Sequence, residues 1–207
     1  MTQVRLSYGA FVLAVFTAGM SLLAYWSHAG NSTGFPVQHL GSVLLWLGIL
    51  AVAAFSPVPL PEHGGTVSLA PAFEFSVLLV FGPSAACWIV VLSRLAANAG
   101  GRWDSRATLA VGQAALAIGV SGFVYDRLGG VTGEAFAVNM GSGLALAAAG
   151  TLHLLLRHGI AAGANALSAP ELASNRMGDA RTAFGIEALF LPFAVPLAFA
   201  DCISPGW

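Results

Sequence analysis

Two charged side chains, Glu74 and Arg94, lie within an otherwise apolar run between residues 73 and 98. A Gly82-Pro83 break separates them and predicts that the chain turns into an antiparallel helical hairpin. At about 1.5 Å per helical residue, Glu74 and Arg94 then lie at depths that agree within one helical turn. Because each charge alone is costly in an apolar environment, we expect an ion pair between them inside the protein.

The expected ion pair has two interpretations. In the first, it only fixes the register of the hairpin. In the second, Glu74 and Arg94 line a polar cavity that holds a ligand or couples a signal. Helical periodicity places Asn98 on the same stripe as Arg94, so Asn98 is a secondary candidate for that cavity.

Four further polar residues are secondary candidates: Gln113, Asn139, His153 and Glu187. His153 and Glu187 are expected near the cytoplasmic ends of their helices, where they could pair; a histidine that snorkels to the interface is the alternative. Gln113 and Asn139 are single polar groups in apolar segments. Such groups usually form hydrogen bonds between helices, and ligand contact is the alternative interpretation.

Catalytic and metal-binding patterns are missing from the sequence. It has no Ser-His-Asp set, no paired catalytic carboxylates and no glycine-rich phosphate loop, and all eight basic residues are arginines, which excludes Schiff-base chemistry on lysine. His39, Glu62 and His63 lack the spacing of a metal site. We therefore expect a non-enzyme without cofactor or metal.

The composition indicates an integral membrane protein. Hydrophobic residues make up 57% of the 207 residues and charged residues only 8%, whereas a soluble domain carries about 25% charged residues. The formal net charge of −1 gives no basic field for nucleic acid. The lipid bilayer is therefore the expected environment of the chain.

Apolar runs separated by short breaks predict an all-α polytopic bundle of about seven transmembrane helices in a single domain, residues 1–207. The third and fourth runs are short for a full crossing. The break at 157–181 is expected to be the longest loop. The predicted helices cover residues 8–26, 37–55, 67–81, 84–98, 107–128, 135–156 and 182–200.

The arginines predict the orientation of this bundle. With the N-terminus in the cytoplasm, seven of the eight arginines lie on or toward the cytoplasmic side, and only Arg127 lies outside. This distribution is the one that the positive-inside rule requires.

The segment from 55 to 98 carries a pattern of turn residues: Pro57, Pro59, Leu60, Pro61, Gly64, Gly65, Val67, Ser68, Leu69, Gly82 and Pro83. With the later VYDRLGG stretch, it resembles the N-terminal multi-helix membrane sensory domains of bacterial GGDEF and HD-GYP signalling proteins. A weaker similarity is to the S-components of energy-coupling-factor transporters. The first resemblance covers about residues 45 to 200 and implies a multi-pass protein of the bacterial cytoplasmic (inner) membrane.

The resemblance implies a non-catalytic sensory or ligand-binding domain with an unidentified small ligand. Members of that family usually continue with another helix and a cytoplasmic output domain, so this chain is either part of a longer protein or a stand-alone relative. Two alternatives stay open: a structural accessory subunit of a larger membrane complex and a substrate-binding component of a small-molecule transporter. The expected partners are lipid, other membrane chains or further copies of this chain, and no nucleic acid.

Overall fold

The computed structural model describes residues 2–29, 40–56, 58–59, 66–101, 103–132, 140–168 and 173–203. Within these ranges the chain is almost entirely helical, which confirms the all-α class. A short antiparallel ribbon of β1 (Val58–Pro59) and β2 (Thr66–Val67) joins two of the helices. The helices are α1 (Thr2–Ala29), α2 (Leu40–Phe55), α3 (Ala70–Asn98), α4 (Ser105–Arg127), α5 (Met140–Ser168), α6 (Ala173–Phe190) and α7 (Ala194–Ile203), with a 3-10 turn η5 (Leu191–Phe193) before α7.

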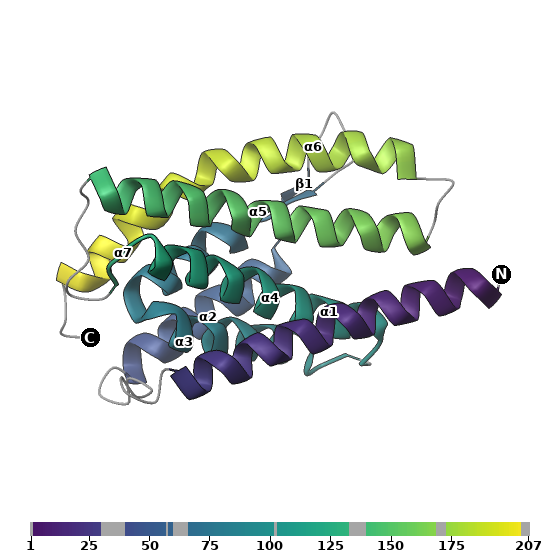
Figure 1. Cartoon of the computed structure of the whole chain (residues 1–207), viewed down its shortest axis with the longest axis horizontal. Coiled ribbons are helices and arrows are strands. Elements are labelled where there is room, and N and C mark those ends of the chain that lie inside the picture. Colours follow the sequence, from purple (N-terminus) through teal and green to yellow (C-terminus); the bar gives the residue numbers. More distant parts are fainter. Residues whose placement is uncertain are drawn as a thin grey trace.

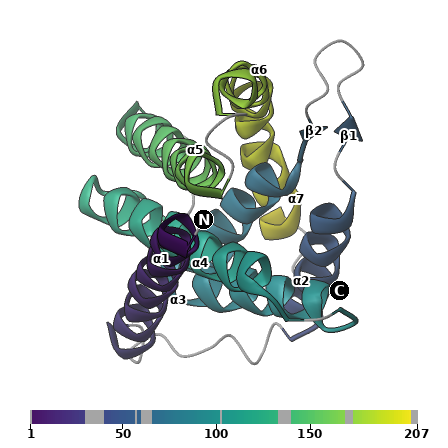
Figure 2. The same ribbon diagram turned by 90° about the vertical axis from the view of Figure 1, so that its right-hand side faces the viewer.

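Helix α3 lies at the centre of the bundle. It packs against α2, α4 and α7, while α4 also packs against α1 on one side and α5 on the other. Figure 1 shows that the first part of α1 and the last part of α5 extend together beyond α3 at one end of the molecule. Figure 2 views the molecule from that end, with α5 and α6 on one side and α2 and the ribbon on another.

A sharp break at Gly82 divides α3 into two arms, residues 70–81 and 83–98. Gly82 has φ 78° and ψ 172°, a conformation that is essentially restricted to glycine. Pro83 follows directly and begins the second arm, where its missing N–H group costs nothing. The break therefore lets the chain reverse direction within one element.

The predicted count of seven transmembrane helices is not supported. Among the described residues, four helices are long and apolar enough to cross a membrane: Leu6–Ala29, Ala70–Asn98, Ser105–Arg127 and Ser142–Ser168. The predicted helices 67–81 and 84–98 are the two arms of α3. Helix α2 has only 16 residues, and the predicted helix 182–200 is interrupted after Phe190 by η5, which contains Pro192.

The predicted loop at 157–181 is also wrong. Helix α5 continues through Arg157 to Ser168, and α6 already begins at Ala173. Residues 157–168 contain no proline and are rich in alanine, which favours continued helix. The gap between two apolar runs suggested a loop, but α5 and α6 cover the described residues of the gap, 157–168 and 173–181.

Helices α1 and α4 approach each other closely through two glycines, Gly19 and Gly112. A Cβ atom added at Gly112 would lie 2.5 Å from the Cα atom of Phe16, and one at Gly19 would lie 2.4 Å from the Gly112 carbonyl oxygen. Small residues at such positions allow close packing of helix backbones. This contact holds α1 against α4 beside the site described next.

The outer helices expose many large apolar side chains. Leu13, Leu44, Leu45, Val52 and Leu144 are each more than half exposed. In contrast, charged Glu74 is fully buried. This arrangement, apolar outside with charge inside, is compatible with a membrane protein.

Candidate functional site

The break at Gly82 brings the two predicted partners, Glu74 and Arg94, together. In one continuous straight helix, 20 residues would separate them by about 30 Å. Instead, Arg94 Nη2 donates a hydrogen bond to Glu74 Oε1. The predicted contact is therefore present, and it requires the two arms of α3 to run antiparallel.

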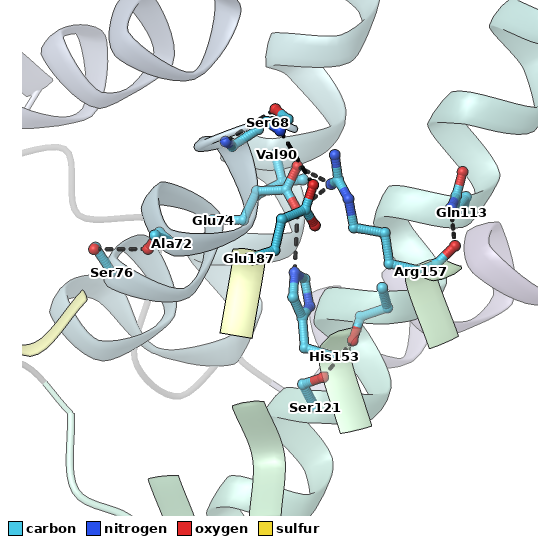
Figure 3. Close-up of polar contacts among 12 residues, drawn as sticks. Ser68, Ala72, Glu74, Ser76, Val90, Gln113, Ser121, His153, Arg157 and Glu187 are labelled. Carbon is cyan, nitrogen blue, oxygen red and sulfur yellow. Dashed lines mark hydrogen bonds and ion pairs between the residues drawn. The ribbon is translucent and has the colours of Figure 1, made fainter. Parts of the chain in front are cut away.

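Glu74 is the centre of a larger cluster of charged and polar side chains (Figure 3). Arg157 of α5 donates from Nη1 to both carboxylate oxygens, at 3.1 and 3.0 Å. His153, one helical turn earlier on α5, places its Nε2 atom 3.2 Å from Glu74 Oε2. Three side chains from two helices therefore converge on one buried carboxylate.

A second carboxylate, Glu187 of α6, joins the same end of the bundle. It is buried and lies 3.0 Å from Nε2 of His158, while its other oxygen accepts the Ser68 backbone N–H at 3.1 Å. The sequence left two possibilities for His153, a pair with Glu187 or a side chain that snorkels to the interface, and the structure shows neither: His153 is fully buried. The two histidines are five residues apart on α5, so they point in different directions, and His153 contacts Glu74 instead.

The remaining predicted residues have different roles. Asn98 donates to the Arg94 carbonyl oxygen at 2.7 Å, a contact within its own helix. Gln113 donates from Nε2 to the backbone oxygen of Arg157 and so links α4 to α5 at the cluster. Asn139 lies outside the described residues.

Arg157 and His158 are the site residues that sequence reasoning missed. Both fall just after the predicted end of their helix and were assigned to the cytoplasmic loop. The signal that could have found Arg157 is its helical spacing. Arg157 follows His153 by four residues, so in a continued helix both side chains lie on the same face, and His158 comes directly after it.

The cluster around Glu74 has an excess of positive charge. Two guanidinium groups contact one carboxylate, while each guanidinium carries more N–H donors than it uses there. Among the described side chains, neither arginine has another acidic partner. The Arg94 and Arg157 side chains are 13% and 19% exposed, so both reach beyond the buried carboxylate.

A pocket of about 230 Å³ opens onto these two arginines. We call it the inner pocket; it is lined by Arg94, Ala110, Gln113, Ala114, Ala117, Arg157, His158 and Ala161. A larger cavity of about 850 Å³, the vestibule, shares Gln113 and Ala161 with it. The vestibule is lined by Tyr8, Ser105, Arg106, Leu109, Gln113, Ala161, Ala164, Asn165 and Ser168.

The vestibule lies at the end of the bundle where α1 begins, α4 begins and α5 ends. Its polar side chains include two hydroxyl groups, Ser105 and Ser168, the amide of Asn165 and the guanidinium of Arg106. The two cavities share Gln113 and Ala161, so the vestibule adjoins the inner pocket that Arg94 and Arg157 line. The arrangement suits the binding of a small polar molecule that carries negative charge.

The described residues contain no group of three or more His, Cys, Asp or Glu side chains placed to hold a metal ion. The chain matches no protein-family model, no curated protein and no solved structure. What the site can do therefore follows from its geometry and its charge.

Proposed function

We propose that this protein is a non-catalytic, ligand-binding sensory domain in the bacterial cytoplasmic membrane. One observation carries the proposal: a polar vestibule adjoins an inner pocket that is lined by two arginines, and these arginines share a single buried carboxylate. One arginine would be enough to neutralise Glu74 and to fix the register of the hairpin. The second arginine therefore suggests a role beyond structure. A cavity at such a buried charged cluster is a default candidate for a binding site.

Placement in a membrane is supported by the long apolar helices α1, α4 and α5, by the apolar arms of α3 and by the arginines. The contact between Glu74 and Arg94 means that α3 enters and leaves on the same side, so its arms form a hairpin of 12 and 16 residues. Both arms are shorter than the roughly 20 residues needed to cross a bilayer. With the N-terminus in the cytoplasm, the vestibule opens toward the cytoplasm.

The sensory role is supported by the resemblance to the membrane domains of bacterial GGDEF and HD-GYP proteins. The cluster also offers a way to transmit a signal. Glu74 links α3 to α5, and Glu187 links α6 both to α5 and to the start of α3. A ligand on Arg157 would therefore act on contacts that hold three helices together.

A second candidate function, a structural accessory subunit, is favoured by an apolar groove along α2. This groove has a volume of about 610 Å³ and is lined by Leu44, Leu45, Gly48, Ile49, Val52, Ala53, Ser56, Leu69 and Phe73. Such a groove could pack against another membrane chain or against lipid. The accessory role predicts no ligand in the vestibule, which separates it from the sensory proposal.

The test is a ligand screen on the purified protein in lipid nanodiscs, with thermal unfolding as the readout. A true ligand should raise the unfolding temperature of the unmodified protein but not of Ala161→Trp, because this substitution fills the boundary between the two cavities. Ala147→Trp, on an exposed position of the same helix, is the matched control. A screen in which every ligand acts equally on Ala161→Trp and the unmodified protein would reject the binding function.

A further inference from the structure

We infer that the ligand carries an oxyanion, a phosphate or carboxylate group, which binds in the inner pocket to Arg94 and Arg157. This inference rests on the proposed binding function and specifies its ligand class. Guanidinium groups match the planar geometry of such oxyanions and bind them through paired hydrogen bonds. The remainder of the ligand is a small polar body that lies in the vestibule.

Both arginines keep N–H donors that Glu74 does not use. Arg94 uses Nη2 to contact Glu74, and Arg157 uses Nη1 for both of its contacts with the same carboxylate. The other guanidinium nitrogens of both residues have no acceptor among the described side chains, and both residues line the inner pocket. Hydrogen bonds from a guanidinium to a charged acceptor are among the stronger ones, so an oxyanion in the pocket would be stabilised there.

Charge at the two arginines also favours an anion. Arg94 and Arg157 share Glu74 as their acidic partner among the described side chains, and no carboxylate lines the inner pocket. Glu187 contacts the lining residue His158 and forms no ion pair with either arginine. A ligand with one negative group, together with Glu74, would therefore match the two positive charges of Arg94 and Arg157. A cationic ligand would be repelled, and a neutral ligand would leave the excess positive charge unchanged.

The lining of the vestibule also suits a polar anion. Arg106 lies two helical turns before Gln113 on the same face of α4, about 10 Å away along the axis. The vestibule therefore carries the positive charge of Arg106, and the inner pocket carries that of Arg94 and Arg157. The hydroxyl and amide groups of Ser105, Asn165 and Ser168 also line the vestibule. This lining suits an elongated polar anion better than an acyl chain.

Glu74 has a specific part in this arrangement, because it competes with the ligand for the arginines. Glu74→Gln keeps the size of the side chain and an oxygen that accepts a hydrogen bond, but it removes the negative charge. The arginines should then bind an oxyanion about tenfold more tightly, even though the protein itself is less stable. A cluster with a purely structural role predicts lower stability without any gain in anion binding.

The experiment measures binding by titration calorimetry and thermal unfolding in nanodiscs of neutral phosphatidylcholine. The probes are inorganic phosphate, succinate and glucose 6-phosphate, with glucose as the neutral control. Glucose 6-phosphate should stabilise the protein, and glucose should not. A parallel arm without added probe compares neutral nanodiscs with nanodiscs that contain phosphatidylglycerol. Stabilisation only by the anionic lipid would assign the oxyanion to a lipid headgroup, whereas stabilisation by the soluble probes would assign it to a free small molecule.

Substitutions then locate the oxyanion. Arg157→Gln and Arg94→Gln should each weaken binding about tenfold or more, and Arg106→Gln should weaken it less. Arg127→Gln is the matched control, because Arg127 lies against the Phe123 ring, outside both cavities. If either buried variant fails to fold, the gain in Glu74→Gln and the loss in Arg106→Gln still test the inference.

Two results would overturn the inference. The first is unchanged or weaker anion binding in Glu74→Gln. The second is a neutral or cationic ligand that Ala161→Trp blocks, while no oxyanion, soluble or lipid, stabilises the protein. That second result would reject the oxyanion but keep the binding function, whereas failure of the vestibule test described above would reject the binding function itself.

Discussion

Arg157 donates two hydrogen bonds to the carboxylate of Glu74 from 83 positions further along the chain. Glu74 lies on the first arm of α3 and Arg157 on α5, so this contact ties the central hairpin to an outer helix. Arg94 reaches the same carboxylate from the second arm. Glu74 is therefore the point at which three helical segments are held together by charge.

The first prediction concerns this junction. Glu74→Gln should lower the free energy of unfolding by roughly 3–5 kcal/mol, because it leaves two arginines without their buried partner. Glu74→Gln combined with Arg94→Leu should recover part of that loss, since only Arg157 then remains without the carboxylate. Thermal and denaturant unfolding in detergent measure both effects. Asp126→Asn, at an exposed position, is the control and should change stability little.

A double variant less stable than Glu74→Gln alone would contradict this account. It would show that, once Glu74 is neutral, the packing of the Arg94 side chain stabilises the protein more than its unpaired charge destabilises it. Equal stability of Glu74→Gln and the unmodified protein would show that the carboxylate does not hold the hairpin to α5.

Part of the site could be predicted from sequence because its signals are local. Gly82 and Pro83 mark the break, and the numbers of residues on either side place Glu74 and Arg94 at similar depth. Contacts between separate helices were harder to predict. Depth alone does not fix how a helix is rotated, so the sequence offered His153 a pair with Glu187 or a place at the interface, whereas it contacts Glu74. Arg157 was lost because its helix was predicted to end one residue earlier.

The helix count failed for a related reason. Hydropathy identified the apolar segments correctly, but it does not distinguish a helix that crosses a membrane from an arm of a bent helix. The break at Gly82 and the contact between Glu74 and Arg94 together show that residues 70–98 turn back on themselves. The extension of α5 to Ser168 is also hard to predict from hydropathy, since its last residues are mostly alanine and glycine with Arg157, His158 and Asn165 among them.

The second prediction concerns Gly82. Its backbone conformation is one that residues with a Cβ atom rarely adopt, and an added Cβ would also lie 3.3 Å from the Thr132 hydroxyl oxygen. Gly82→Ala should therefore lower stability by about 1–3 kcal/mol. Gly48→Ala in α2, where nothing lies within 4 Å, is the control and should be neutral or slightly stabilising. If both substitutions had the same effect, the strain at the break would be disproved.

The third prediction concerns the contact between α1 and α4. Gly112→Ala places a Cβ atom against the backbone of Phe16, which cannot move without displacing α1. The substitution should cost about 1–3 kcal/mol, as overpacking commonly does. Gly143→Ala in α5, which has open space beside it, provides the comparison. The unfolding temperatures of both variants and of the unmodified protein are compared in the same detergent. An unchanged unfolding temperature for Gly112→Ala would mean that α1 and α4 pack less closely than the structure shows.

The fourth prediction concerns the side of the membrane on which each end of α4 lies. We expect Ser105 in the cytoplasm and Val131 outside, and both positions have exposed side chains. Cys87 is fully buried, so replacing Cys202 with serine should give a background that labels weakly. In that background, Val131→Cys should react with a membrane-impermeant maleimide on intact cells, whereas Ser105→Cys should react only after permeabilisation.

This measurement also tests the reversal of α3. If residues 70–98 crossed the membrane once as a straight helix, every later segment would change sides relative to the N-terminus. Ser105→Cys would then react on intact cells and Val131→Cys would not, provided that Arg5 keeps the N-terminus in the cytoplasm. A cysteine introduced at Thr2 fixes that reference, since it should react only after permeabilisation. The labelling pattern of Ser105 and Val131 therefore shows whether α3 returns to the side from which it entered, as the contact between Glu74 and Arg94 requires.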